Sequence, residues 1–189
     1  MSGSTLKVLC QYFYDSLDRI SGVSVSQPWT TQRFYQNGRM VTELNQQSQR
    51  TIVRYQSHAL AQKEHMAAAT STKLLATDQA HSLLRTVSES STQSLAYCAY
   101  GHRPADNNDN NLLGFNGEYL DPVTEHYPLG QGNRFYNPRL MRFNSPDDLS
   151  PFEEGGINPY VYCQGDPINF SDPSGNIRYP LAVRLAPPI

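Results

Sequence analysis

The stretch LGFNGEYLDPVTEHYPLGQGNRFYNPRLMRFNSPDDLSPFEEGGINPYVYCQGDPINFSDPSGN, from Leu113 to Asn176, decides the fold class of this chain. Asp, Asn or Ser precedes proline in it at positions 121–122, 137–138, 145–146, 158–159, 166–167 and 172–173. Each pair favours a turn, because the polar side chain hydrogen-bonds to nearby backbone while proline fixes φ. The elements between the turns must therefore be short, with apolar faces supplied by Phe135/Tyr136, Leu140/Phe143 and Tyr160/Tyr162.

Upstream of this stretch, strand-like segments recur about every 20 to 22 residues, centred on Tyr14, Tyr35, Tyr55, Leu75 and Tyr97. A fixed period in this range is typical of stacked supersecondary units that each bury one face against the next. In the second unit, Asn37-Gly38 separates two strand-like runs, which is the strongest short-range hairpin signal. We therefore predict antiparallel hairpins over residues 10–56.

Composition and charge exclude several classes of protein. Aromatic residues make up 11% of the chain at a mean hydropathy of −0.57, which favours strands over a helical bundle. The formal net charge is −2 and the basic residues are scattered, so we expect no nucleic-acid partner. No run approaches the roughly 18 apolar residues of a membrane span, and the N-terminus lacks the apolar region of a signal peptide. We expect a chain made in the cytoplasm, with any export through a specialised delivery system.

Cysteine and histidine patterns predict neither disulfides nor a metal site. Cys10, Cys98 and Cys163 are odd in number and far apart, without a CxxC pair, so we predict buried free thiols in a reducing compartment. His58 and His65 would share a face if residues 57–71 were helical, but no acidic residue or cysteine is arranged beside them. Common nucleotide-binding and hydrolase motifs are absent from the sequence, and we expect no cofactor.

Four motifs in order carry a resemblance to a known family: GFNGEYLDPVT at 114–124, GNRFYNPRLMRFNSPD at 132–147, GGINPYVYCQGDPIN at 155–169 and DPSG at 172–175. Together they resemble the RHS repeat-associated core, the closing module of the RHS/YD-repeat family. Members of that family build a hollow β-shell around a C-terminal toxin. The segment YFYDSLDRISGV at 12–23 resembles the YD repeat itself.

The resemblance implies an all-β fold that forms part of a β-spiral shell. We expect YD-repeat hairpins over 1–104, a polar surface loop at 105–112, the core domain over 113–176 and a short variable tail at 177–189. Residues 57–71, SHALAQKEHMAAATS, are rich in helix formers and allow a short helix. The alternative is a strand and loop that continue the spiral, because tertiary context overrides helix propensity.

The resemblance also implies a candidate catalytic site, since family cores can act as aspartate-type proteases that cut themselves just after DPxG. The matching positions are Asp147 and Asp172, with Arg134 as the basic residue. Two carboxylates at close range cannot both ionise, so one can act as general acid while the other activates water. Each of these aspartates is also a common turn former, and we expect Asp166 to be structural.

Two departures from the family pattern count against cleavage. Asn176 stands where many relatives have Leu after the glycine of DPxG, and Glu125 stands where DPVTG would place a turn glycine. The residues after Gly175 are also too few for a toxin domain, so we expect a shell segment without its toxin.

Three functions remain open from the sequence. The first is a structural terminal segment of an RHS/YD shell, pairing with other RHS chains or with itself through an unpaired N-terminal edge strand. The second is a single-turnover aspartyl autoprotease acting near Asn176. The third is a sugar-binding or partner-binding β-module with stacking rings at Tyr12, Tyr14, Tyr35, Tyr97 and Tyr100. No cargo or immunity partner can be named from these residues.

Overall fold

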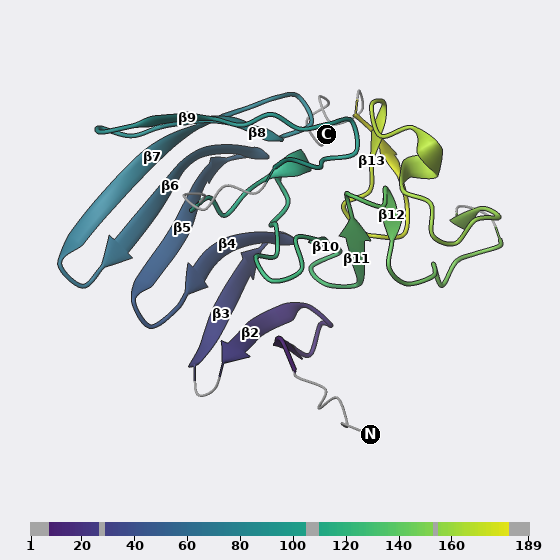
Figure 1. Ribbon diagram of the computed structural model, residues 1–189, viewed down its shortest axis with the longest axis horizontal. Coiled ribbons are helices and arrows are strands. Elements are labelled where there is room, and N and C mark those ends of the chain that lie inside the picture. The colour runs from purple at the N-terminus through teal and green to yellow at the C-terminus, as the bar shows by residue number, and fades with distance from the viewer. Residues whose placement is uncertain (1–7, 27–28, 105–109, 153–154, 182–189) are drawn as a thin grey trace, which may run out of the picture.

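The computed structural model describes residues 8–26, 29–104, 110–152 and 155–181, which fold almost entirely into antiparallel β structure (Figure 1). The predicted all-β class is confirmed. The 3-10 helices η1 (Phe115–Gly117) and η3 (Cys163–Gly165) are single turns. Within the described ranges, no helix has the length and apolar character needed to cross a membrane.

The large sheet is a meander in which each strand pairs with the strands before and after it in the chain. Figure 1 shows its strands arranged in a curve, with segments that follow β9 in the chain on the inner side of that curve. The strands are β1 (Gln11–Tyr14), β2 (Ile20–Ser26), β3 (Trp29–Gln36), β4 (Arg39–Leu44), β5 (Ser48–Tyr55), β6 (His58–Met66), β7 (Ala69–Thr77), β8 (Leu83–Val87) and β9 (Thr92–Ser94).

The sequence period corresponds to one hairpin of this sheet. Tyr14, Tyr35, Tyr55 and Leu75 lie in β1, β3, β5 and β7, so each repeat adds two strands, whereas Tyr97 follows β9 and lies outside a strand. The predicted hairpins over residues 10–56 are therefore confirmed. Residues 57–71 form β6 and the start of β7, and the alternative of a helix there is wrong.

The reason for strands at this position is tertiary. β6 pairs with β5 along its whole length and with β7 from Ala61 to Met66, and the buried Gln62 and Glu64 lie on either side of the exposed Lys63. This alternation requires a period of two, which a helix cannot provide. The helix-forming residues therefore occupy a strand because of the partners on either side.

A row of alternating charges crosses the inner face of the large sheet. Arg33, Glu43, Arg50 and Glu64 are directly paired across β3, β4, β5 and β6. Nε of Arg33 lies 3.3 Å from Oε2 of Glu43, and Arg50 also forms an ion pair with Glu43. Arg33 and Glu43 are 5% and 2% exposed, so these charges are satisfied by one another and not by solvent.

The segment from Asn110 to Asp121 covers this inner face. The Gln62 side chain holds it there: Nε2 donates to the carbonyl of Asn110 at 2.8 Å, and Oε1 accepts the N–H of Leu112 at 2.9 Å. Asn110 donates in turn to both carboxylate oxygens of Glu64.

Of the loop predicted at 105–112, residues 105–109 lie outside the described ranges, and Leu112 is fully buried where a surface position was expected. It joins a core with Met40, Ile52, Ala59 and Leu113.

A second core is built from aromatic side chains of the predicted core domain. It surrounds a three-stranded sheet of β10 (Tyr127–Leu129), β11 (Arg134–Asn137) and β12 (Arg142–Phe143). The rings of Tyr136 and Tyr162 stack with centroids 4.0 Å apart, and Phe143 meets both edge-on. Leu140 and Tyr160, predicted to supply apolar faces, are instead 62% and 39% exposed. They lie in turns that point away from this core.

The remaining strands and the turns follow local backbone chemistry. β13 (Phe170–Ser171) pairs with β14 (Tyr179–Pro180), while residues 182–189 of the predicted tail lie outside the described ranges. As predicted, the residues before proline close turns: Oδ2 of Asp121 accepts the N–H of Thr124 at 2.9 Å, and Oδ1 of Asn137 accepts the N–H of Arg139 at 3.0 Å. These Asx turns account for the short strands between them.

The burial of the three free cysteines differs from the prediction. Cys163 is buried, whereas Cys10 is half-buried and Cys98 is exposed. Cys98 lies in the turn after β9, where its backbone bonds to His102 and Gly101 hold the chain and its side chain faces outward. The small apolar character of cysteine is therefore used only at position 163.

The β3–β4 turn yields the first testable prediction. Asn37 and Gly38 have φ of 50° and 69°, which fits the predicted tight hairpin turn. The nearest atom to a Cβ at Gly38, Nε2 of Gln131, would lie 3.8 Å away, so a side chain fits but its backbone would be strained. We expect Gly38→Val to lower the free energy of unfolding by more than about 1 kcal/mol. Gly38→Asn should lower it less, because Asn tolerates positive φ. Equal denaturation midpoints for the two variants would contradict this account.

Candidate active site

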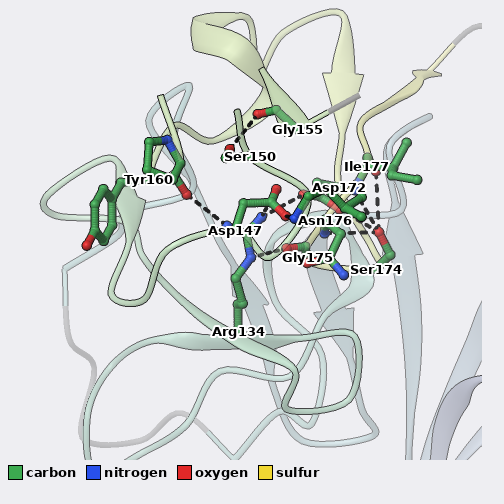
Figure 2. Close-up of polar contacts among 12 residues, drawn as sticks. Arg134, Asp147, Ser150, Gly155, Tyr160, Asp172, Ser174, Gly175, Asn176 and Ile177 are labelled. Atoms are coloured by element: carbon green, nitrogen blue, oxygen red, sulfur yellow. Dashed lines mark hydrogen bonds and ion pairs between the residues drawn. The ribbon is translucent and has the colours of Figure 1, made fainter. Parts of the chain in front are cut away.

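One strand end and two loops of the second core bring the predicted site residues together (Figure 2). Arg134 opens β11, Asp147 lies in the turn after β12, and Asp172 follows β13 directly. They are 4%, 7% and 4% exposed. The structure thus places all three sequence-predicted residues in one buried cluster.

The Arg134 guanidinium is the centre of this cluster. Its Nη2 donates to Oδ2 of Asp147 at 3.0 Å and lies 3.9 Å from Oδ2 of Asp172. Nη1 donates to the carbonyl of Pro159 at 3.0 Å, and Nε donates to the carbonyl of Gly175. The guanidinium carbon also lies 3.7 Å from the centre of the Phe143 ring. Every nitrogen of the group has a partner, which fixes its position.

The two carboxylates have different environments. Burial raises the pKa of Asp172 to about 6, although the hydroxyl of Ser174 and the charge of Arg134 oppose the shift. Asp147 instead forms the closer ion pair with Arg134 and accepts the N–H of Leu149 at 3.0 Å. Burial lowers the pKa of Arg134, and Asp147 and then Asp172 act against that change. The site therefore combines a carboxyl whose pKa is raised by burial with a second carboxyl held in an ion pair, and such a difference in environment is what acid–base chemistry uses.

The chain after Asp172 is closed into a tight turn by Ser174. Its hydroxyl donates to Oδ1 of Asp172 at 2.9 Å and accepts the N–H groups of Asn176 and Ile177 at 3.1 and 3.0 Å. The side chain of Asn133 donates to Oδ1 of Asn176 at 3.1 Å. This turn holds the carbonyl of Gly175 against Arg134.

The arrangement can polarise one peptide bond. A guanidinium N–H at the Gly175 carbonyl occupies the place of an oxyanion-stabilising donor for attack on the Gly175–Asn176 bond. Asp147 and Asp172, both next to Arg134, carry the type of group that general acid–base catalysis uses. A cavity of about 10 Å³ borders Asp172, which is about the space of a single water molecule.

Sequence reasoning missed the groups that complete this site. Pro159 and Gly175 contribute backbone carbonyls, which carry no sequence signal, and Phe143 was assigned only to the core. Ser174 had a signal, because a hydroxyl two residues after Asp is typical of a local side-chain turn.

The other candidate residues lie elsewhere. Asp166 accepts from both the backbone N–H and the side chain of Asn169, so it closes a turn, in line with the structural role expected for it. His58 lies against His81 with ring centroids 5.0 Å apart, and His65 hydrogen-bonds to Thr70. Across the described part of the chain, no group of three or more His, Cys, Asp or Glu residues is placed to hold a metal ion.

The five tyrosines considered for sugar stacking are largely engaged inside the protein. Tyr12 donates to Asp121 at 2.9 Å, and Tyr35 donates to the carbonyl of Ile20 at 2.7 Å. Tyr14 and Tyr100 likewise donate to the backbone carbonyls of glycines, and the ring of Tyr97 packs against Phe115. Tyr97 and Tyr100 pack against the aromatic core, and Tyr35 packs against the core that contains Leu112.

Comparisons with known proteins agree with this architecture. The family model described as Teneurin YD-shell matches residues 4–168. No curated protein matches the chain. Among solved structures it is similar to a crystal structure of TcdB2-TccC3 without the hypervariable C-terminal region, with a TM-score of 0.51 and 14% sequence identity. The match covers 88% of this chain and 10% of that one, so this chain spans about a tenth of its length. At this identity the likeness shows the fold alone.

The raised pKa of Asp172 predicts how stability depends on pH. Its folded-state pKa of about 6 exceeds the unfolded value of about 3.9. Stability from this group is therefore present at low pH and lost as the pH rises through about 6. We therefore compare the free energies of unfolding of Asp172→Asn and the wild type. The value for Asp172→Asn minus the value for the wild type should rise by about 2 to 3 kcal/mol from pH 4 to pH 7. Denaturant titrations across this pH range measure the shift.

Asp166→Asn provides the control with the opposite sign. Hydrogen bonds from Asn169 lower the pKa of Asp166, so its contribution to stability is present above the ordinary carboxyl range and lost on acidification. The free energy of unfolding of the wild type should therefore increase relative to that of Asp166→Asn as the pH rises. Parallel pH profiles for the wild type and Asp172→Asn would show that the Asp172 carboxyl is not desolvated.

Proposed function

The chain belongs to the Teneurin YD-shell family, and from this membership we propose that it serves as a structural segment of an RHS/YD shell. The observation that carries the proposal is the large sheet, which grows by one strand at a time in sequence order. Its inner face is covered in part by the segment from Asn110 to Asp121, whose Leu112 and Leu113 share a core with Met40 and Ile52 of the sheet. A wall of this kind can be extended by further hairpins without changing its interior.

The two ends of the described sheet differ in what they present. Among the described residues, β1 pairs only with β2, and apolar side chains are exposed along it and just before it, at Val8, Leu9, Phe13 and Tyr14. At the other end, β9 is three residues long and polar. An apolar edge strand favours pairing with another strand. We infer that the β1 edge is where this segment joins another RHS chain or a second copy of itself.

Self-cleavage is the second candidate function, and the geometry around Arg134 favours it. The residues match a single-turnover aspartyl protease that would hydrolyse the Gly175–Asn176 bond. One carboxyl would activate water, the other would protonate the leaving nitrogen, and Arg134 would stabilise the carbonyl oxygen. The closed turn that Ser174 forms with Asn176 and Ile177 acts against attack, so we place the scaffold first.

Association through β1 can be tested by light scattering. We expect the wild type to self-associate as its concentration rises, and Phe13→Lys to reduce that association, because a charged side chain on an edge strand opposes pairing. Phe152→Lys is the matched control, since Phe152 is 73% exposed and lies in a turn outside the sheet. A monomeric wild type, or equal effects of the two substitutions, would rule out this edge as the joining surface.

Mass spectrometry of the purified chain separates the two candidate functions. A scaffold without cleavage gives the full 21.3 kDa, and this is the result we expect. Self-cleavage gives a product that ends at Gly175, and Asp147→Asn or Asp172→Asn should each restore the full mass by removing one half of the acid–base pair. Finding that product in the wild type would make proteolysis the principal function.

A further inference from the structure

A cavity of about 460 Å³ lies between the large sheet and the second core. Tyr35, Arg39, Met40 and Arg54 of the sheet line it, together with Leu113, which shares a core with Met40. Its volume falls in the range of sites for small organic molecules, and its walls are both apolar and charged. Neither carboxyl of the candidate active site lines this cavity, although Ser174, which donates to Asp172, does.

Positive charge in this cavity exceeds the negative charge that faces it. Arg33 lines the cavity but is already paired with Glu43 and stacked on Tyr119, with its guanidinium carbon 3.8 Å from the ring centre. Arg39 donates from Nη1 to the carbonyl of Ser57 at 2.7 Å. Because this acceptor is neutral, the bond does not balance the charge of the guanidinium. Glu118 is the acidic residue among the described lining residues.

Arg54 is the cavity arginine with the least favourable polar surroundings. Its Nε is buried and has no hydrogen-bond partner among the described residues. Burial, and next the nearby charge of Arg39, lower the pKa of Arg54 to about 10, and Glu118 offsets this only in part. Two neighbouring guanidinium groups in a partly buried cavity repel each other, and an anion between them would satisfy both.

We propose that this cavity binds a small organic anion, with a carboxylate or phosphate group between Arg39 and Arg54 and an apolar body against Met40 and Leu113. Arginine is suited to this role because its planar donors match both oxyanions. The apolar wall favours a ligand with a flat hydrocarbon portion over a bare inorganic ion.

Calorimetric titration of the full chain tests the site with benzoate and with inorganic phosphate, in chloride of matched ionic strength. We expect at least one of the two to bind, and Arg54→Met and Arg39→Gln each to weaken that binding at least about tenfold through loss of a charge-assisted contact. Arg139→Met is the matched control, because Arg139 forms an exposed ion pair with Glu125 outside the cavity, and it should bind as the wild type does.

The choice of probe and the melting temperature sharpen the test. Tighter benzoate binding assigns a carboxylate ligand, and tighter phosphate binding assigns a phosphate ligand. In chloride alone, Arg54→Met should melt no lower than the wild type, because it removes a buried charge with an unpartnered nitrogen. Absence of binding beyond the chloride control, or unchanged affinity in both cavity variants, would overturn the proposal.

Discussion

The hydrogen bonds between the Gln62 amide and the backbone of Asn110 and Leu112 are the contacts on which the rest of the structure depends. They dock the covering segment onto a sheet face that carries the buried charges of Arg33, Glu43 and their neighbours. Buried charges are tolerated only when paired and hydrogen-bonded, so this face could not be covered by apolar residues alone. Because Leu112 is held in place, the residues that follow it enter the aromatic core at a defined position relative to the large sheet.

That position makes the candidate active site a part of the scaffold as well. Arg134 joins two turns through the carbonyls of Pro159 and Gly175 and lies over Phe143 of the aromatic core. Loss of its guanidinium would leave these carbonyls and Asp147 without a shared partner. An Arg134 variant would therefore disturb the fold and any chemistry together, and only the carboxylates can separate the two roles.

Features fixed by local chemistry could be predicted from the sequence, and features fixed by register could not. The Asn37-Gly38 hairpin and the turns at Asp121 and Asn137 depend on φ and on nearby hydrogen bonds, which residue types determine. The pairing of Arg33 with Glu43 and the burial of Leu112 depend on which residues meet across strands. No single segment encodes that. The cluster of Arg134, Asp147 and Asp172 followed from the family resemblance and not from spacing, and the carbonyls of Pro159 and Gly175 that complete it became visible only in three dimensions.

The identity of residue 172 bears on the choice between scaffold and enzyme. Ser174 donates to Oδ1 of this side chain, and an asparagine oxygen could accept the same bond without a desolvated charge. A pure scaffold would therefore be more stable at neutral pH with Asn at this position, given that burial raises the pKa of Asp172. Carboxyl groups with raised pKa values beside a fixed cation are concentrated at functional sites. Asp172 is thus the residue whose presence the structural role alone explains least.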